Sequence, residues 1–165
     1  MARSHGRADG SSGTKLIAAN RRARRNYDIL ETVEAGLVLR GSEVKSLREA
    51  HVQLGDAFAR IEGGEAWLLS MHVGVYEHSQ RHSGHEPERR RKLLLHRSEI
   101  DRLRQIVDEQ HLSLVPLSLY FKDGRAKVEL ALARGRKTYD KRQVLAKRDA
   151  DREAARAIAR AGRGD

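Results

Sequence analysis

The segment LSLYFKDGRAKVELAL, residues 117–132, carries the clearest secondary-structure signal in the chain. Apolar side chains occupy every second position on both sides of Asp123-Gly124. A period of two is typical of a half-buried β-strand, and Asp-Gly favours a tight hairpin turn. The segment therefore predicts an antiparallel hairpin with one face in an apolar core.

Two more hairpins are predicted nearer the N-terminus, because short alternating runs there are interrupted by glycine. The first pairs residues 27–33 with 37–39 and turns at Gly36. The second pairs residues 58–61 with 66–69 and turns at Gly63-Gly64. A short helix is predicted at 41–48 with Ser42 as its cap, and a helix of about three turns from Ser98. Many short strands and a small aliphatic core predict a mainly β chain folded as an antiparallel barrel with flanking α-helices.

Composition narrows the function classes. The 165 residues contain no cysteine, which excludes thiol catalysis, thiolate metal sites and disulfides. The 33 Lys and Arg against 23 Asp and Glu give a net charge of +10. Such a balance predicts a polyanionic partner, either nucleic acid or an anionic membrane. The N-terminus has no apolar run of the kind that a signal peptide needs, so a cytoplasmic protein is expected.

The charge is unevenly distributed and indicates three parts. Residues 1–26 carry +6, 81–97 carry +4 and 135–165 carry +5, whereas 27–80 carry −5 and 98–134 are neutral. We predict a flexible tail at 1–14, a barrel at 15–134 and a basic C-terminal tail at 135–165. Because none of the basic segments has a bulky apolar face, nucleic acid is favoured over a membrane.

The C-terminal tail repeats arginine every four residues, which places one row of charge along a helix. The row consists of Arg148, Arg152, Arg156 and Arg160. Like charges at this spacing oppose the helix until a phosphate backbone lies beside them. We therefore predict a tail that is disordered when free and helical on RNA; a solvated, salt-bridged helix is the alternative.

Neither a metal site nor a catalytic site is predicted. His78, His82 and His85 have no carboxylate or cysteine at a recognised spacing to complete a metal site. No Ser/His/Asp, phosphate-loop or dinucleotide motif is present. We therefore predict a binding protein that needs no cofactor and is not an enzyme. A structural ribosomal protein and a metal-dependent ribonuclease remain as rival interpretations.

Two basic clusters are the candidate phosphate contacts. The first is Asn20-Arg21-Arg22-Ala23-Arg24-Arg25, followed by Tyr27, whose ring could either stack on a base or pack in the barrel. The second is Arg89-Arg90-Arg91-Lys92, which runs directly into Leu93-Leu94-Leu95. We expect that second cluster to lie at the rim of a core strand.

Three segments together resemble the SsrA-binding protein family, also called small protein B. They are NRRARRNYDILETVEAGLVLRGSEVKSLR from Asn20, PERRRKLLLHRSEI from Pro87 and GRKTYDKR from Gly135. The resemblance implies an OB-like barrel that binds the tRNA-like part of transfer-messenger RNA. It also implies a tail that enters the decoding region and the empty mRNA channel of the small ribosomal subunit, contacting its rRNA. Elongation factor Tu is an expected partner, no membrane is involved, and the chain is expected to be a monomer.

The resemblance also implies which residues contact RNA. It points to Asn20, Arg21, Arg24, Glu34, Lys92, Leu94, Lys127 and Lys137 on the barrel face. The predicted RNA-binding set further includes Arg22, Arg25, Tyr27, Arg89, Arg91 and Arg136. The predicted decoding-centre set is Tyr139, Asp140, Lys141, Arg142, Arg148, Arg152, Arg156 and Ile158.

Overall fold

The predicted late hairpin is present as strands β8 and β9, joined by a tight turn. In the computed structural model, which describes residues 13–75, 85–136 and 138–162, β8 spans Ser113–Lys122 and β9 spans Arg125–Gly135. Asp123 and Gly124 both have positive φ, 51° and 78°, as a two-residue hairpin turn requires. Lys122 and Arg125 therefore face each other as the first pair of the ladder.

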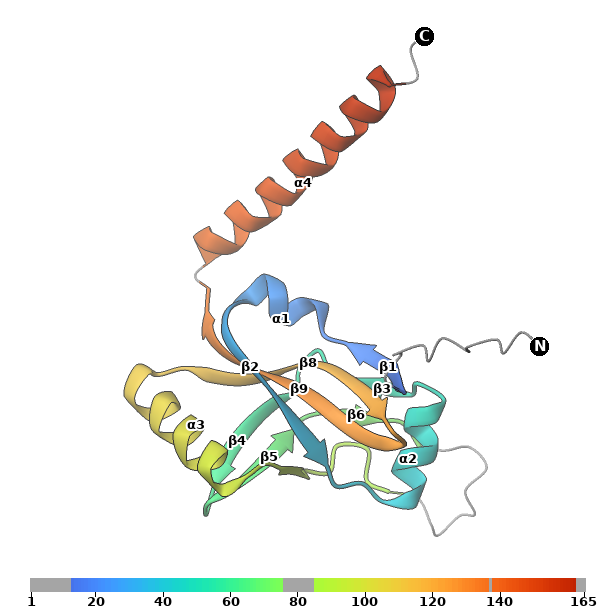
Figure 1. Ribbon diagram of the computed structural model, residues 1–165, viewed down its shortest axis with the longest axis vertical. Coiled ribbons are helices and arrows are strands. Elements are labelled where there is room, and N and C mark those ends of the chain that lie inside the picture. The colour runs from blue at the N-terminus through green and yellow to red at the C-terminus, as the bar shows by residue number, and fades with distance from the viewer. Residues whose placement is uncertain (1–12, 76–84, 137, 163–165) are drawn as a thin grey trace, which may run out of the picture.

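The remaining elements flank this hairpin in sequence and in space (Figure 1). They are β1 (Thr14–Ala19), α1 (Arg21–Asn26), β2 (Tyr27–Leu37), α2 (Gly41–Arg48), β3 (Val52–Gln53), β4 (Phe58–Glu62), β5 (Glu65–Leu69), β6 (His72–Val73), β7 (Arg91–Leu94), α3 (Arg97–Gln110) and α4 (Thr138–Ala161). The predicted tail 1–14 lies outside the described residues except for Gly13 and Thr14, and Thr14 already belongs to β1.

The strands close into an antiparallel barrel. The order β8-β4-β5-β7-β2-β9 returns to β8 through the β8–β9 pairing, while β1 adds to the outside of β8. The closing contact between β4 and β8 pairs Ala59 with Leu114. A separate small sheet joins β3 to β6. The predicted fold class, a mainly β antiparallel barrel with flanking helices, is confirmed.

An aliphatic core fills the barrel. Its fully buried side chains include Leu68, Leu93, Leu119 and Leu130 from four different strands. Helix α3 buries Ile100 and Leu103 against one end, as the apolar spacing of its sequence requires. The core is built almost wholly from Leu, Val, Ala and Met because the chain has few aromatic residues.

The predicted turn at Gly36 is wrong. Strand β2 continues through it to Leu37, and Gly36 lies opposite Leu94 of β7. A Cβ at this position would come within 3.1 Å of the Leu94 Cβ, so glycine here allows two strands to approach closely. The chain therefore has one long strand where the sequence predicted a hairpin.

Both predicted helices exist: α2 has the predicted bounds, 41–48, but a different cap, and α3 begins earlier than predicted. Helix α2 is capped at Arg40, whose backbone N–H donates to the Glu43 carboxylate at 2.9 Å, and Ser42 lies inside the helix. Helix α3 is capped at His96 and begins one residue before Ser98. No helix in the described parts of the chain is long and apolar enough to cross a membrane.

The C-terminal segment is a 24-residue helix, α4, that leaves the barrel beside α1 and projects away from the sheet (Figure 1). The predicted helix is present, and its disorder in the free chain stays a prediction. Seven of its residues are alanine, the best helix former, and the prediction did not weigh that preference. Alanine needs no packing partner to favour a helix.

A buried ion cluster joins α2 to β7. The side chains of Glu43 and Arg91 are fully buried, and the Arg91 Nε donates to the Glu43 carboxylate. Arg91 also donates to the carbonyls of Met71 at 2.8 Å and Pro87 at 3.1 Å, and Arg89 donates to the other Glu43 oxygen. Burial alone would raise the pKa of Glu43, but hydrogen bonds from the Arg40 N–H and the two guanidiniums outweigh it and lower that pKa.

We expect Glu43→Gln to destabilise the fold by about 3–5 kcal/mol, because the buried guanidinium of Arg91 loses its counter-charge. Urea unfolding followed by the fluorescence of Trp67, the single tryptophan, measures the change. Glu49→Gln is the matched control, since Glu49 lies just after α2 with its side chain 45% exposed. Equal unfolding free energies for the two variants would show that the buried pair contributes nothing.

Candidate nucleic-acid interface

Asn20 is a structural residue that fixes the first basic cluster. It is only 5% exposed, and its Oδ1 accepts from the Ala23 N–H at 3.2 Å as the N-cap of α1. Its Nδ2 donates to the carbonyls of Leu54 at 3.2 Å and Pro116 at 2.9 Å. The prediction that Asn20 itself contacts RNA is therefore corrected: its amide is used inside the protein.

The arginines of α1 point outward as predicted. Ala23 is buried beneath the helix, whereas Arg21, Arg22, Arg24 and Arg25 are exposed. Arg22 lies 3.7 Å from the carboxylate of Asp56, and both side chains are largely in solvent. Such a weak pair leaves the helix as a positively charged ridge.

Tyr27 and Arg136 lie at the other end of α1. Tyr27 is half-buried and packs on a small apolar cluster that includes Ala23 and Val115. Of the two alternatives for its ring, stacking on a base or packing in the barrel, the structure shows packing. The Arg136 side chain is 16% exposed and donates from Nε to Asp28 at 2.8 Å. Its backbone N–H also donates to the Asn26 carbonyl. Arg136 thus fixes the point where the barrel leads into the C-terminal segment.

The second basic cluster divides between the inside and the outside of the barrel. Because β7 alternates, Arg91 and Leu93 point inward, and the prediction that Arg91 contacts RNA is wrong. The Arg89 side chain forms an ion pair with Glu43 and is 23% exposed. Lys92 points outward and pairs with Glu65 at 3.0 Å.

Arg90 extends the outer surface of this cluster. Its guanidinium lies 4.1 Å from the centre of the Trp67 ring, and its Nη1 lies 3.5 Å from Glu62. The prediction of a rim anchored to a core strand therefore holds for Arg90 and Lys92.

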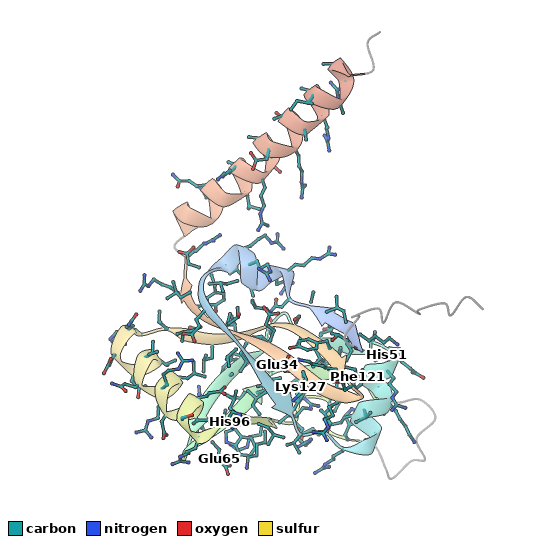
Figure 2. The ribbon with its side chains drawn as sticks, in the orientation of Figure 1. Glu34, His51, Glu65, His96, Phe121 and Lys127 are labelled. Atoms are coloured by element: carbon teal, nitrogen blue, oxygen red, sulfur yellow. The ribbon has the colours of Figure 1, made fainter. Side chains whose placement is uncertain are left out.

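Glu34, Leu94 and Lys127 come together on the outer face of the barrel, where β7 meets β2. They line a cavity of about 380 Å³ with His96 and Glu99. Figure 2 shows Glu34 and Lys127 close together on neighbouring strands. Leu94 is 54% exposed, between the buried Leu93 and the partly buried Leu95.

Two polar residues in this site were missed by sequence reasoning. Tyr120 donates from its hydroxyl to the Glu34 carboxylate at 2.5 Å, and Lys122 lies 3.5 Å from the other oxygen. The Tyr120 hydrogen bond chiefly lowers the pKa of Glu34, and the charges of Lys122 and Lys127 lower it further. Burial, followed by the hydrogen bond to Glu34, raises the pKa of Tyr120. The alternation of β8 could have identified Tyr120 and Lys122 as members of this site, because both lie on the outward face of the strand.

The C-terminal candidates lie on α4 or just before it. Lys137 falls outside the described residues. Tyr139, Asp140 and Lys141 begin the helix, and their side chains also fall outside what is described. The exposed side chains farther along are Arg142, Arg148, Arg152, Arg156 and Ile158. Ile158 is 74% exposed.

The histidine group offers no metal site among the described residues. His78 and His82 lie outside them. His85 is buried, with its two ring nitrogens 3.0 Å from the Ser42 hydroxyl and 3.0 Å from the Val73 carbonyl. Because both ring nitrogens are hydrogen-bonded, His85 connects α2 to β6.

A small antiparallel barrel with an aliphatic core, an arginine ridge and a second lysine-bearing face defines the class of nucleic-acid-binding barrel proteins. The profile of the SmpB protein family matches residues 17–160. The chain belongs to this family, and the resemblance seen in its sequence is confirmed.

Individual relatives agree over nearly the whole chain. An SsrA-binding protein of Mycolicibacterium paratuberculosis is 54% identical over 168 residues, which cover 99% of each chain. An SsrA-binding protein of Desulforudis audaxviator is 60% identical over 150 residues, covering 91% of this chain and 95% of the relative. A solved structure described as "tmRNA-SmpB: a journey to the center of the bacterial ribosome" contains a chain that is 49% identical, with a TM-score of 0.62, covering 73% of this chain and 85% of the other.

We expect Tyr120→Phe to raise the pKa of Glu34 toward its ordinary value, because the strongest hydrogen bond to the carboxylate is lost. A carboxyl-detected NMR titration of Glu34 measures the shift. Tyr27→Phe, at the far end of the barrel, should leave that titration unchanged. An unmoved pKa in the Tyr120 variant would rule out the hydrogen bond in solution.

Proposed function

We propose that this chain binds transfer-messenger RNA, also called SsrA, and delivers it to stalled ribosomes for trans-translation. The observation that carries the proposal is the near-full-length identity to proteins named for SsrA binding. The solved relative described with transfer-messenger RNA and the bacterial ribosome supports both partners. The arginine ridge on α1 and the Glu34–Leu94–Lys127 surface supply the charge and shape contacts that folded RNA requires.

The proposal divides the work between the barrel and the tail. The barrel holds the tRNA-like part of the RNA, and α4 enters the decoding centre and the empty mRNA channel of the small subunit. Exposed arginines along α4 match a channel walled by ribosomal phosphates. The chain acts in the cytoplasm as a monomeric, non-enzymatic adaptor, with elongation factor Tu in the delivery complex, as the resemblance implies.

We expect Arg21→Ala/Arg24→Ala to weaken binding to transfer-messenger RNA and to reduce the salt dependence of that binding. Each lost phosphate contact should lower the slope of log K against log salt by about 1. Filter binding over a series of salt concentrations measures both effects. Arg48→Ala/Arg125→Ala removes the same charge from exposed positions elsewhere and is the matched control. If both variants lose affinity equally, binding depends on net charge and not on the α1 ridge.

We expect truncation after Gly135 to leave affinity for transfer-messenger RNA largely intact and to abolish tagging of stalled polypeptides. The barrel keeps every strand in this variant, whereas α4 is removed. An in vitro translation system stalled on an mRNA without a stop codon gives the second readout. Truncation after Ala161, which keeps α4, should retain both activities. Loss of RNA affinity in the longer truncation would refute the division of labour.

A further inference from the structure

A cavity of about 660 Å³ lies between α1, β4 and the C-terminal half of α3. We call it the α1–α3 cavity. None of the residues that line it belongs to the Glu34–Leu94–Lys127 surface. Its volume falls in the range of roughly 300–1,000 Å³ that is typical of small-molecule sites.

The cavity combines an apolar floor with aromatic rings. Ala59, Val107 and Leu114 contribute aliphatic surface, and Tyr27 and Phe58 contribute rings. Phe58 is 37% exposed even though much of the chain's apolar surface is buried in the core. A partly exposed ring above an aliphatic floor suits a flat, apolar-faced ligand.

Charged groups at the mouth narrow the choice of ligand. The arginines at the mouth are Arg22, Arg60 and Arg104, and the guanidinium of Arg60 lies 5.6 Å from the centre of the Phe58 ring. Asp56 and Asp108 also line the cavity, and their carboxylates would repel a bare phosphate. A carboxylate instead accepts from an exocyclic amino group of a base. The side chains of Asn26 and Ser113 add an amide and a hydroxyl that can hydrogen-bond a base edge.

The neighbouring α1 ridge shows how such a ligand would arrive. Arg22 belongs both to the ridge and to the cavity lining. A sugar-phosphate backbone that follows the exposed arginines of α1 therefore passes the cavity mouth. We propose that the α1–α3 cavity binds one unpaired, amino-bearing nucleobase of the RNA held by α1, with Phe58 as its stacking surface. This inference rests on the proposed function, and the base comes from either transfer-messenger RNA or small-subunit rRNA.

The test compares Phe58→Ala and Phe58→Leu with the wild type. Replacing an aromatic residue by alanine removes the stacking of a base on its ring and weakens binding. For the RNA that supplies the base, we therefore expect the Kd of Phe58→Ala to be about tenfold higher than that of the wild type. Phe58→Leu keeps the apolar volume without the ring and should give a smaller loss. The salt slope should stay at the wild-type value, because no phosphate contact is removed. Titration against transfer-messenger RNA and, separately, against purified small subunits identifies the source of the base.

Phe121→Leu is the matched control, since Phe121 is the only other phenylalanine and packs on the main core (Figure 2). It should bind both RNAs with the wild-type Kd. Thermal melts establish that each variant is folded. If Phe58→Ala does not fold, wild-type protein is irradiated with RNA containing 6-thioguanosine, and the crosslink is expected in the tryptic peptide 49–60.

Wild-type Kd values for both Phe58 variants against both RNAs would overturn the nucleobase site while leaving the proposed function intact. A crosslinked peptide elsewhere in the chain, with none at 49–60, would also overturn it. Failure of the wild type itself to bind either RNA would instead refute the proposed function and this inference with it.

Discussion

The buried carboxylate of Glu43 is the interaction on which the arrangement of the barrel depends. It receives the Arg40 N–H at the start of α2 and the guanidiniums of Arg89 and Arg91. A buried charge without a partner is strongly destabilising, so β7 can occupy only the register that places Arg91 inside. A slip of one residue would bury Lys92 and expose Leu93. The same ion pair therefore decides that Lys92 and Leu94 face solvent.

The two outer surfaces are fixed by polar side chains whose hydrogen bonds are made within the protein. Asn20 joins α1 to the Leu54 loop and to β8, which presents the α1 arginines outward. Arg136 joins the end of β9 to Asp28 and thereby sets where α4 departs. The placement of the α1 arginines and of α4 thus rests on hydrogen bonds within the protein, whereas the proposed function assigns the attraction for RNA to the exposed arginines and lysines. In the proposed function, this separation lets the tail act away from the barrel.

Sequence alone predicted the elements whose pattern is local. The β8–β9 hairpin follows from alternation and Asp-Gly, and α3 follows from its apolar spacing. Pairings distant in sequence were not predictable in the same way: Gly36 resembles a turn until Leu94 is seen opposite it. The alternation of β7 could have identified Arg91 as inward-facing, because it shares parity with Leu93. Nothing local indicated that Glu43, which lies 48 residues away in the sequence, would accept a hydrogen bond from Arg91. The roles of Asn20 and Arg136 likewise depend on carbonyls and carboxylates brought near only by the closed barrel.

Sequencing the RNA that copurifies with the full chain from a bacterial cytoplasm tests the central claim most directly, since no partner has to be chosen in advance. The account predicts that one structured small RNA, transfer-messenger RNA, dominates the bound fraction over the much more abundant transfer RNAs. A bound fraction with the composition of total cellular RNA would contradict it, because the protein would then recognise only polyanionic charge.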